Sequence, residues 1–214
     1  MSRSRLPLLV VLAAFAACAG GCGSSPPSTY YALSPANGSA QPSLVRTVKL
    51  RRPGIAGYLD RPEIVERVVD HRLHVADTER WASPLDEMIG RVLAQDVEQR
   101  LAGSVVFTED GAITADADAT VEIDVRELGV GEDGQVNLVA ELAIEKGDSH
   151  VPAATRAIHL RGREKGASTS ALVATMSDLV GQLADQVADL VAGRYSAPAS
   201  SARSSSLSDA SPTP

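Results

Sequence analysis

Apolar residues in the second half of the chain follow two different periods, and this change of period constrains the fold more than any other feature. Between Ala119 and Lys165, apolar and charged residues alternate in three segments separated by turn residues. Alternation places each class of side chain on one face of a strand, so we predict a three-stranded meander, with a bulge near Glu127 where the pattern changes phase. From Ser168 to Gly193, apolar residues recur every three or four positions, which predicts one long helix.

The first half of the chain predicts a second helix. Ser83 is a suitable N-cap, Pro84 suits the first helical position, and an apolar stripe then continues to Leu101, before a stop at Gly103. Both helices have one apolar stripe and can therefore cover the apolar face of the sheet. The sequence predicts a two-layer α+β domain, in which an antiparallel-rich mixed sheet carries two amphipathic helices on one face.

Shorter apolar segments predict the remaining strands. We expect strands at residues 29–33, 44–50 and 104–108, and two more on either side of a tight turn at Asp70 and His71. Residues 51–60 contain a proline and two glycines and predict a turn-rich loop.

Charge and motifs exclude several classes of function. The formal net charge is −7, so the chain has no general attraction for the phosphates of nucleic acids. It contains no glycine-rich phosphate loop, no Cys/His zinc motif and no nucleophile elbow. His71 and His74 are three residues apart, which places them on opposite faces of a strand. We therefore predict a protein that is not an enzyme and has no metal site and no cofactor.

The N-terminus has the features of an export signal. Arg3 and Arg5 precede an uncharged apolar run that ends in small residues. The strongly apolar part, from Leu6 to Ala17, is about 12 residues long, whereas a membrane-spanning helix needs about 20. Residues 1–21 are therefore predicted to be a signal peptide that is removed.

The two cysteines of the chain, Cys18 and Cys22, lie at the end of this signal. Because no other cysteine follows, an internal disulfide framework is excluded for the exported domain. The run AGGCGSS resembles a bacterial lipobox, which implies cleavage before Cys22 and acylation of its sulfur and new amino group. Cys18 is a competing site, but the Gly/Ser/Pro spacer begins at Cys22. We expect a lipoprotein tether at residues 22–29, a folded domain at residues 30–194 and a disordered tail at residues 195–214.

Residues 57–97 resemble the PqiC-type auxiliary lipoproteins of ABC transport systems. The resemblance rests on the run Tyr58-Leu59-Asp60-Arg61-Pro62, on Ile64-Val65 and on the Trp81-x-x-Pro84-Leu85 helix start. It implies a non-enzymatic protein on the periplasmic face of the outer membrane, and Gly23 directly after the lipidated cysteine agrees with outer-membrane sorting. The implied partners are a periplasmic MCE-domain protein and, indirectly, an ABC permease and ATPase. A homo-oligomer is compatible with the resemblance.

The sequence also suggests which residues contact the partner. We predict partner binding at Tyr58, Leu59, Asp60 and Arg61, in a loop with many backbone turn residues, and at Trp81 as an anchor. The alternatives are that this loop only packs between strands and that Trp81 fills the space between helix and sheet. Two other functions stay open. One is a structural envelope lipoprotein that binds peptidoglycan or another outer-membrane assembly, and the other is a periplasmic enzyme of unrecognised type.

Overall fold

The computed structural model describes residues 26–112, 115–147 and 153–193. Its elements, in chain order, are β1 (Thr29–Tyr31), β2 (Gln41–Pro42), β3 (Thr47–Leu50), β4 (Gly54–Ile55), β5 (Glu63–Val69), β6 (Arg72–Trp81), α2 (Leu85–Arg100), β7 (Leu101–Ala102), β8 (Val105–Thr108), β9 (Ala119–Val130), β10 (Val136–Lys146), β11 (Ala154–Gly162) and α3 (Thr169–Val191). None of the helices in the described ranges is long and apolar enough to cross a bilayer.

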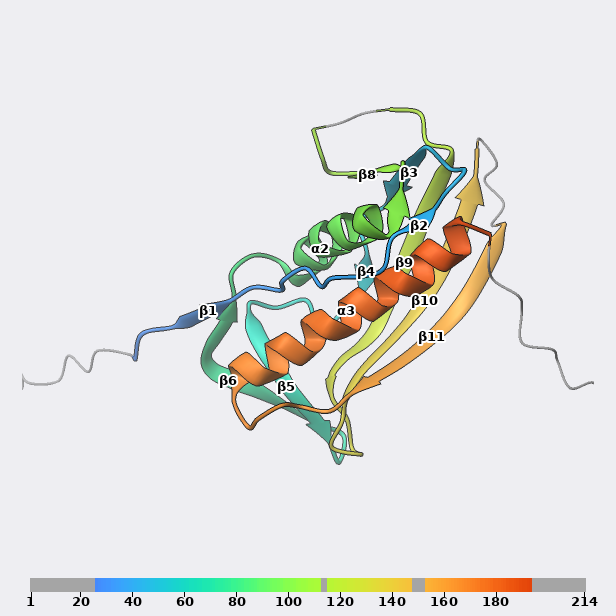
Figure 1. Ribbon diagram of the computed structural model, residues 1–214. Helices are drawn as coiled ribbons and strands as arrows, with labels where there is room; N and C mark the ends of the chain where they lie inside the picture. The colour runs from blue at the N-terminus through green and yellow to red at the C-terminus, as the bar shows by residue number, and fades with distance from the viewer. Residues whose placement is uncertain (1–25, 113–114, 148–152, 194–214) are drawn as a thin grey trace, which may run out of the picture.

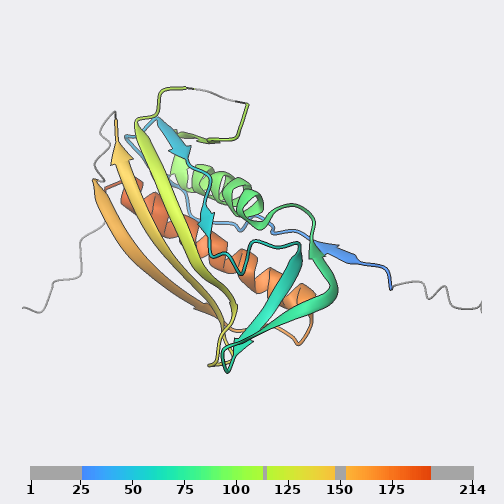
Figure 2. The same ribbon diagram turned by 180° about the vertical axis from the view of Figure 1, so that it is seen from behind.

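A mixed sheet forms one layer of the domain, and both helices form the other. The strand order is β1-β6-β5-β9-β10-β11, while β3 and β4 pair in parallel with β9 and β8 pairs with β3. The helices α2 and α3 pack side by side on one face and leave the opposite face open (Figures 1 and 2). The predicted α+β class, with two helices on one face of an antiparallel-rich sheet, is therefore confirmed.

The predicted meander and its bulge are present in β9, β10 and β11. Val139 lies opposite Glu127, but the next residue, Ala140, lies opposite Val125, so Arg126 is the extra residue of the bulge. Val125 and Leu128 are three positions apart and would lie on opposite faces of a regular strand. Because of the extra residue between them, both are buried in the core.

The predicted hairpin turn between β5 and β6 is also present. Asp70 and His71 have φ values of 50° and 61°. Two consecutive left-handed residues match the twist of the strands that they join.

Two predicted helix ends are wrong by a few residues. Pro84, not Ser83, is the N-cap of α2, and no side chain caps this end. The chain stays extended through Ala82, whose N–H donates to the carbonyl of Tyr31, so the helix begins only at Leu85. At the other end, α2 stops at Arg100 rather than Gly103, because Leu101 and Ala102 pair with β2.

Helix α3 agrees with its predicted start. Ser168 is the N-cap of α3, and its hydroxyl accepts the N–H of Ala171. Strand β3 begins at Thr47, later than predicted, and β4 lies inside the segment predicted as a loop.

An extended segment, residues 32–46, crosses the outer side of the two helices on its way from β1 to β3 (Figure 1). We name it the strap. Its backbone is held by side chains of both helices: the Ser34 N–H donates to Ser177 Oγ (3.1 Å) and the Ala36 N–H donates to Asp96 Oδ1 (3.0 Å). The strap therefore joins the start of the domain to the helix layer.

Below the strap, two charged residues of α2 are buried. Asp96 is 0% exposed and Arg100 is 2% exposed. Arg100 pairs through Nε with Asp185 of α3 and donates through Nη1 to the carbonyls of Ala36 (3.2 Å) and Asp96 (2.9 Å). Burial raises the pKa of Asp96, although the Ala36 N–H and the Arg100 charge oppose this shift.

We expect the contribution of Asp118 to stability to disappear in acid. Its carboxylate accepts the N–H groups of Thr47 and Arg46, which lowers its pKa below 3.8. A lowered folded-state pKa stabilises the fold above the unfolded pKa, and this gain is lost as the pH falls through the folded pKa. Urea unfolding should therefore show that Asp118→Asn is less stable than wild type at pH 7, with a difference that shrinks towards pH 3. A difference independent of pH would contradict this role.

Candidate partner-binding surface

The loop that carries four of the predicted binding residues lies between β4 and β5. Two backbone hydrogen bonds hold it in place: the Ala56 N–H donates to the Val125 carbonyl, and the Leu59 N–H donates to the Ala56 carbonyl. Asp60 and Arg61 are exposed, and neither makes a side-chain bond or ion pair with another described residue. Their charges are therefore available to a partner.

Tyr58 connects this loop to the sheet. Its side chain is half-buried, and its hydroxyl donates to the carbonyl of Arg126 (3.2 Å), the extra residue of the β9 bulge. Burial raises the pKa of Tyr58, and the nearby Glu127 charge adds to the shift. The bulge thus places the predicted loop next to the charged residues of β9.

Leu59 and Trp81 occupy the core instead of the surface. Leu59 is 2% exposed and Trp81 is 5% exposed. Trp81 ends β6, where it pairs with Tyr31, and its backbone N–H donates to the carbonyl of Pro62. Apolar side chains buried to this extent contribute to the packing of the core and are not accessible to a partner in this conformation. The prediction of partner contact then rests on Tyr58, Asp60 and Arg61.

Arg126 organises the charges on the open face of the sheet beside this loop. Asp124 and Glu141 lie directly opposite each other on β9 and β10, an arrangement in which two like charges repel. Arg126 bridges them, with Nη2 at 2.7 Å from Glu141 Oε2 and Nε at 3.6 Å from Asp124 Oδ2. All three side chains are more than half exposed.

Arg51 forms a second bridge at the next position along the face. Its guanidinium pairs with Glu122 of β9 and lies 3.7 Å from Glu145 of β10, which is only 8% exposed. The Nε of Arg51 is buried and has no hydrogen-bond partner among the described residues. Each arginine therefore bridges two carboxylates of neighbouring strands and offsets part of their repulsion.

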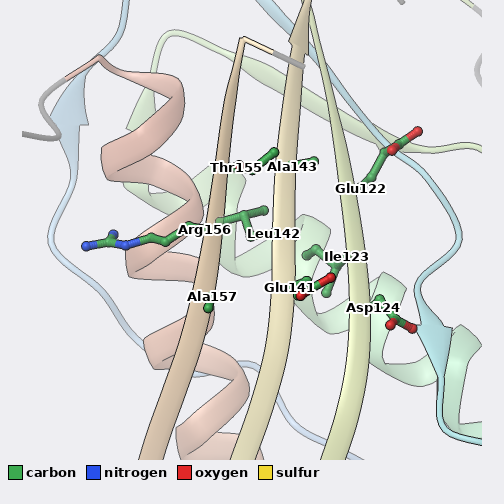
Figure 3. Close-up of a pocket in the computed structure, with 9 residues that line it drawn as sticks. All are labelled: Glu122, Ile123, Asp124, Glu141, Leu142, Ala143, Thr155, Arg156 and Ala157. Carbon is green, nitrogen blue, oxygen red and sulfur yellow. The ribbon is translucent and has the colours of Figure 1, made fainter. Parts of the chain in front are cut away.

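A depression of about 570 Å³ lies across β9, β10 and β11 on the open face (Figure 3). Its lining includes the small residues Ala143, Thr155 and Ala157 and the carboxylates Glu122, Asp124 and Glu141. We define the loop–sheet surface by six residues, three from the loop and three from the neighbouring strands β9 and β10: Tyr58, Asp60, Arg61, Asp124, Arg126 and Glu141.

The charges of this surface are accessible to a partner. The surface presents charges of both signs, and in the described part of the chain no group of three His, Cys, Asp or Glu side chains could hold a metal ion. His71 and His74, considered above as ligands, lie on the β5–β6 hairpin, away from this face. Cys22, the predicted lipidation site, lies outside the described residues.

Sequence reasoning located only part of this surface. Alternation along β9 places Glu122, Asp124 and Arg126 on the charged side. Glu141 was missed, although it follows the same alternation on β10. That this face adjoins the loop at Tyr58 depends on the bulge and on the pairing of β4 with β9, which no local pattern reveals.

Comparisons with known proteins agree with this architecture. The profile of a family described as "ABC-type transport auxiliary lipoprotein component" matches residues 31–188. The chain is similar to the crystal structure of an uncharacterized protein, with 20% sequence identity and a TM-score of 0.65 over 78% of this chain and 99% of that one. A crystal structure of a DUF330 protein from Xanthomonas campestris has 19% identity and a TM-score of 0.64, over 78% and 97%. At these identities the two structures show the fold alone. No curated protein sequence matches the chain.

Proposed function

The chain belongs to the family of ABC-type transport auxiliary lipoprotein components, and from this premise we propose that it docks a periplasmic MCE-domain protein at the outer membrane. The family match supports a non-enzymatic auxiliary role in a transport system. It spans the described domain from β1 almost to the end of α3, so the whole domain serves that role. The MCE partner and the membrane are the finer parts of the proposal.

The proposed anchor is a lipid on Cys22. The run before Cys22 has the small residues of a lipobox, and a thiolate is the best side-chain nucleophile for acylation. Two or three acyl chains bind a membrane durably, whereas one binds only marginally. Gly23 at the next position supports the outer membrane as the destination. The domain would then lie on the periplasmic face, as a monomer or as a homo-oligomer.

The proposed contact for the partner is the loop–sheet surface. It combines exposed, unpaired charges at Asp60 and Arg61 with a rigid sheet face that no helix covers. Charges of both signs on a rigid face favour specific docking of a complementary protein. The ABC permease and ATPase would contact the MCE-domain protein and not this chain.

Site-specific cross-linking in intact cells tests the proposal. A photoreactive residue at Asp60 or Arg126 is expected to capture the MCE-domain protein, identified by mass spectrometry of the membrane-extracted complex. The same probe at Leu44, which is fully exposed on the strap, serves as the control and should capture no such protein. Capture from Leu44 alone, or of peptidoglycan instead of protein, would contradict the proposal.

Exchanging the two loop charges should weaken the complex without unfolding the domain. We expect Asp60→Lys/Arg61→Glu to reduce the yield of co-purified partner by about tenfold, equivalent to about 1.4 kcal/mol. Both side chains are exposed and without described partners, so stability should stay within about 0.5 kcal/mol of wild type. The matched exchange Arg163→Glu/Glu164→Arg, beside the start of α3, should leave the yield unchanged. Equal yields from both variants would exclude the loop as a contact.

A further inference from the structure

The edge strand β6 is only partly covered by β1. The two strands run in parallel, and the pairs are Thr29 with Glu79, Tyr30 with Arg80 and Tyr31 with Trp81. In the described part of the chain, no strand pairs with the outer edge of β6 between Arg72 and Thr78. An open edge of this kind offers N–H and C=O groups to any extended segment within reach.

The segment within reach is the chain that precedes β1. Continuing the same parallel register one residue at a time places Ser28 beside Thr78 and, at the far end, Cys22 beside Arg72. The tether from Cys22 to Ser28 therefore has the length and direction to extend β1 along the whole open edge.

The described part of the tether does not take this path. Residues 26–28 are exposed and outside any strand. In both views residues 26–28 lead away from the domain, while β6 continues towards its hairpin with β5 (Figures 1 and 2).

Two consecutive prolines explain why β1 begins only at Thr29 and does not start earlier in the chain. Along a strand, alternate residues direct their N–H and C=O groups to opposite neighbours, so one of any two consecutive residues must face β6. Pro26 and Pro27 both lack an N–H, so the residue that faces β6 cannot donate in either case. A single proline could have pointed outwards, but two cannot.

We propose that Pro26–Pro27 is a strand stop that keeps the tether off β6 and so determines which end of the domain faces the membrane. With the stop, the tether leaves the domain at Thr29. Without it, β1 would extend and the tether would leave nearer the β5–β6 hairpin, about 13 Å further along for four added residues. The membrane part of this inference rests on the proposed lipidation of Cys22, whereas the strand stop itself does not.

Hydrogen exchange on the full mature chain tests the strand stop. The variant Ser25→Thr/Pro26→Val/Pro27→Thr restores the missing donors and favours strand, while Ser25→Thr alone is the matched control that keeps both prolines. Alternate amides of Val75–Thr78 should exchange rapidly in wild type and control, and at least tenfold more slowly in the triple variant. Slow exchange in wild type, or no change in the triple variant, would overturn the proposal. Pro26 and Pro27 are exposed, so the fold should survive their substitution.

Fluorescence energy transfer tests the orientation. Signal removal and lipidation leave no free thiol, so a dye can be attached through Leu73→Cys near the hairpin, or through Leu44→Cys between β2 and β3 as the control site. In vesicles of phosphatidylethanolamine and phosphatidylglycerol with acceptor lipids, the triple variant should bring the Leu73 dye about 10 Å closer to the bilayer, but not the Leu44 dye. Equal distances in wild type and variant would overturn the orientation. If the wild-type protein did not bind vesicles at all, the proposed lipid anchor would be wrong. The hydrogen-exchange experiment would still test the strand stop, because it does not depend on the anchor.

Discussion

Replacing Arg100 by alanine is expected to lower the free energy of unfolding by about 3–5 kcal/mol, because it leaves the backbone carbonyls of Ala36 and Asp96 without their side-chain donor and removes the positive charge near the buried Asp96 carboxylate. Asp96 is fully buried beneath the strap, and Arg100 is the cation that faces it. The same substitution removes the ion pair to Asp185 and the contact that holds Ala36. Chemical denaturation of the domain measures the loss directly.

The matched control for this prediction is Arg91→Ala, which removes an exposed arginine from the same helix. It should change stability by no more than about 0.5 kcal/mol. If both variants lost the same amount, the buried cluster would contribute nothing beyond a surface arginine.

The pH dependence of the Arg100→Ala defect follows from the raised pKa of Asp96. A group whose folded-state pKa is raised supports the fold below its unfolded pKa and loses that contribution as the pH rises through the folded pKa. Without Arg100 the charged form of Asp96 becomes even less favourable than in wild type. The loss of stability in Arg100→Ala should therefore be larger at pH 7 than at pH 4. In the Asp96→Asn background there is no buried carboxylate charge for the loss of Arg100 to leave uncompensated. The loss of stability caused by Arg100→Ala should therefore be smaller in that background at pH 7.

Replacing Cys22 by alanine should move the protein from the membrane fraction almost completely into the soluble periplasmic fraction. Each buried methylene of an acyl chain contributes about 0.8 kcal/mol to membrane binding, so losing every chain removes the anchor. The described helices are too short or too polar to span a bilayer, and the net charge of the chain is negative. Fractionation and intact-mass measurement of the native protein detect both the release and the missing acyl mass.

Cys18→Ala is the control for this experiment. If Cys22 is the lipidated residue, this variant should keep its acyl mass and stay with the membrane. The reverse pattern, with release by Cys18→Ala and retention by Cys22→Ala, would assign the lipid to Cys18. Release by neither variant would contradict lipid anchoring.

The elements with clear periodicity could be predicted from the sequence. The apolar stripe of α3, its cap at Ser168 and the alternation along β9 to β11 arise from interactions between residues near in sequence. Even the bulge was visible, because an inserted residue shifts the alternation that burial imposes. The ends of α2 were not predictable, since its first residue depends on a bond from Ala82 to β1 and its last on the pairing of Leu101 with β2.

The candidate surface was predicted less completely, for the same reason. An exposed Asp60 and a buried Leu59 are neighbours in the chain, and only packing separates them into a surface and a core residue. Trp81 resembles a binding anchor in sequence but is buried at the end of β6. The buried Asp96 and Arg100 have no local signal that distinguishes them from the exposed charges of α2.

The sequence alone determined the α+β class of this protein, because the periodicity of apolar residues depends only on their order along the chain. Only the tertiary structure decided what lies together: the strap over Arg100, Tyr58 against the β9 bulge, and an edge strand that β1 leaves open after two prolines. These arrangements depend on contacts between residues far apart in the chain, and such contacts form only when the layers pack.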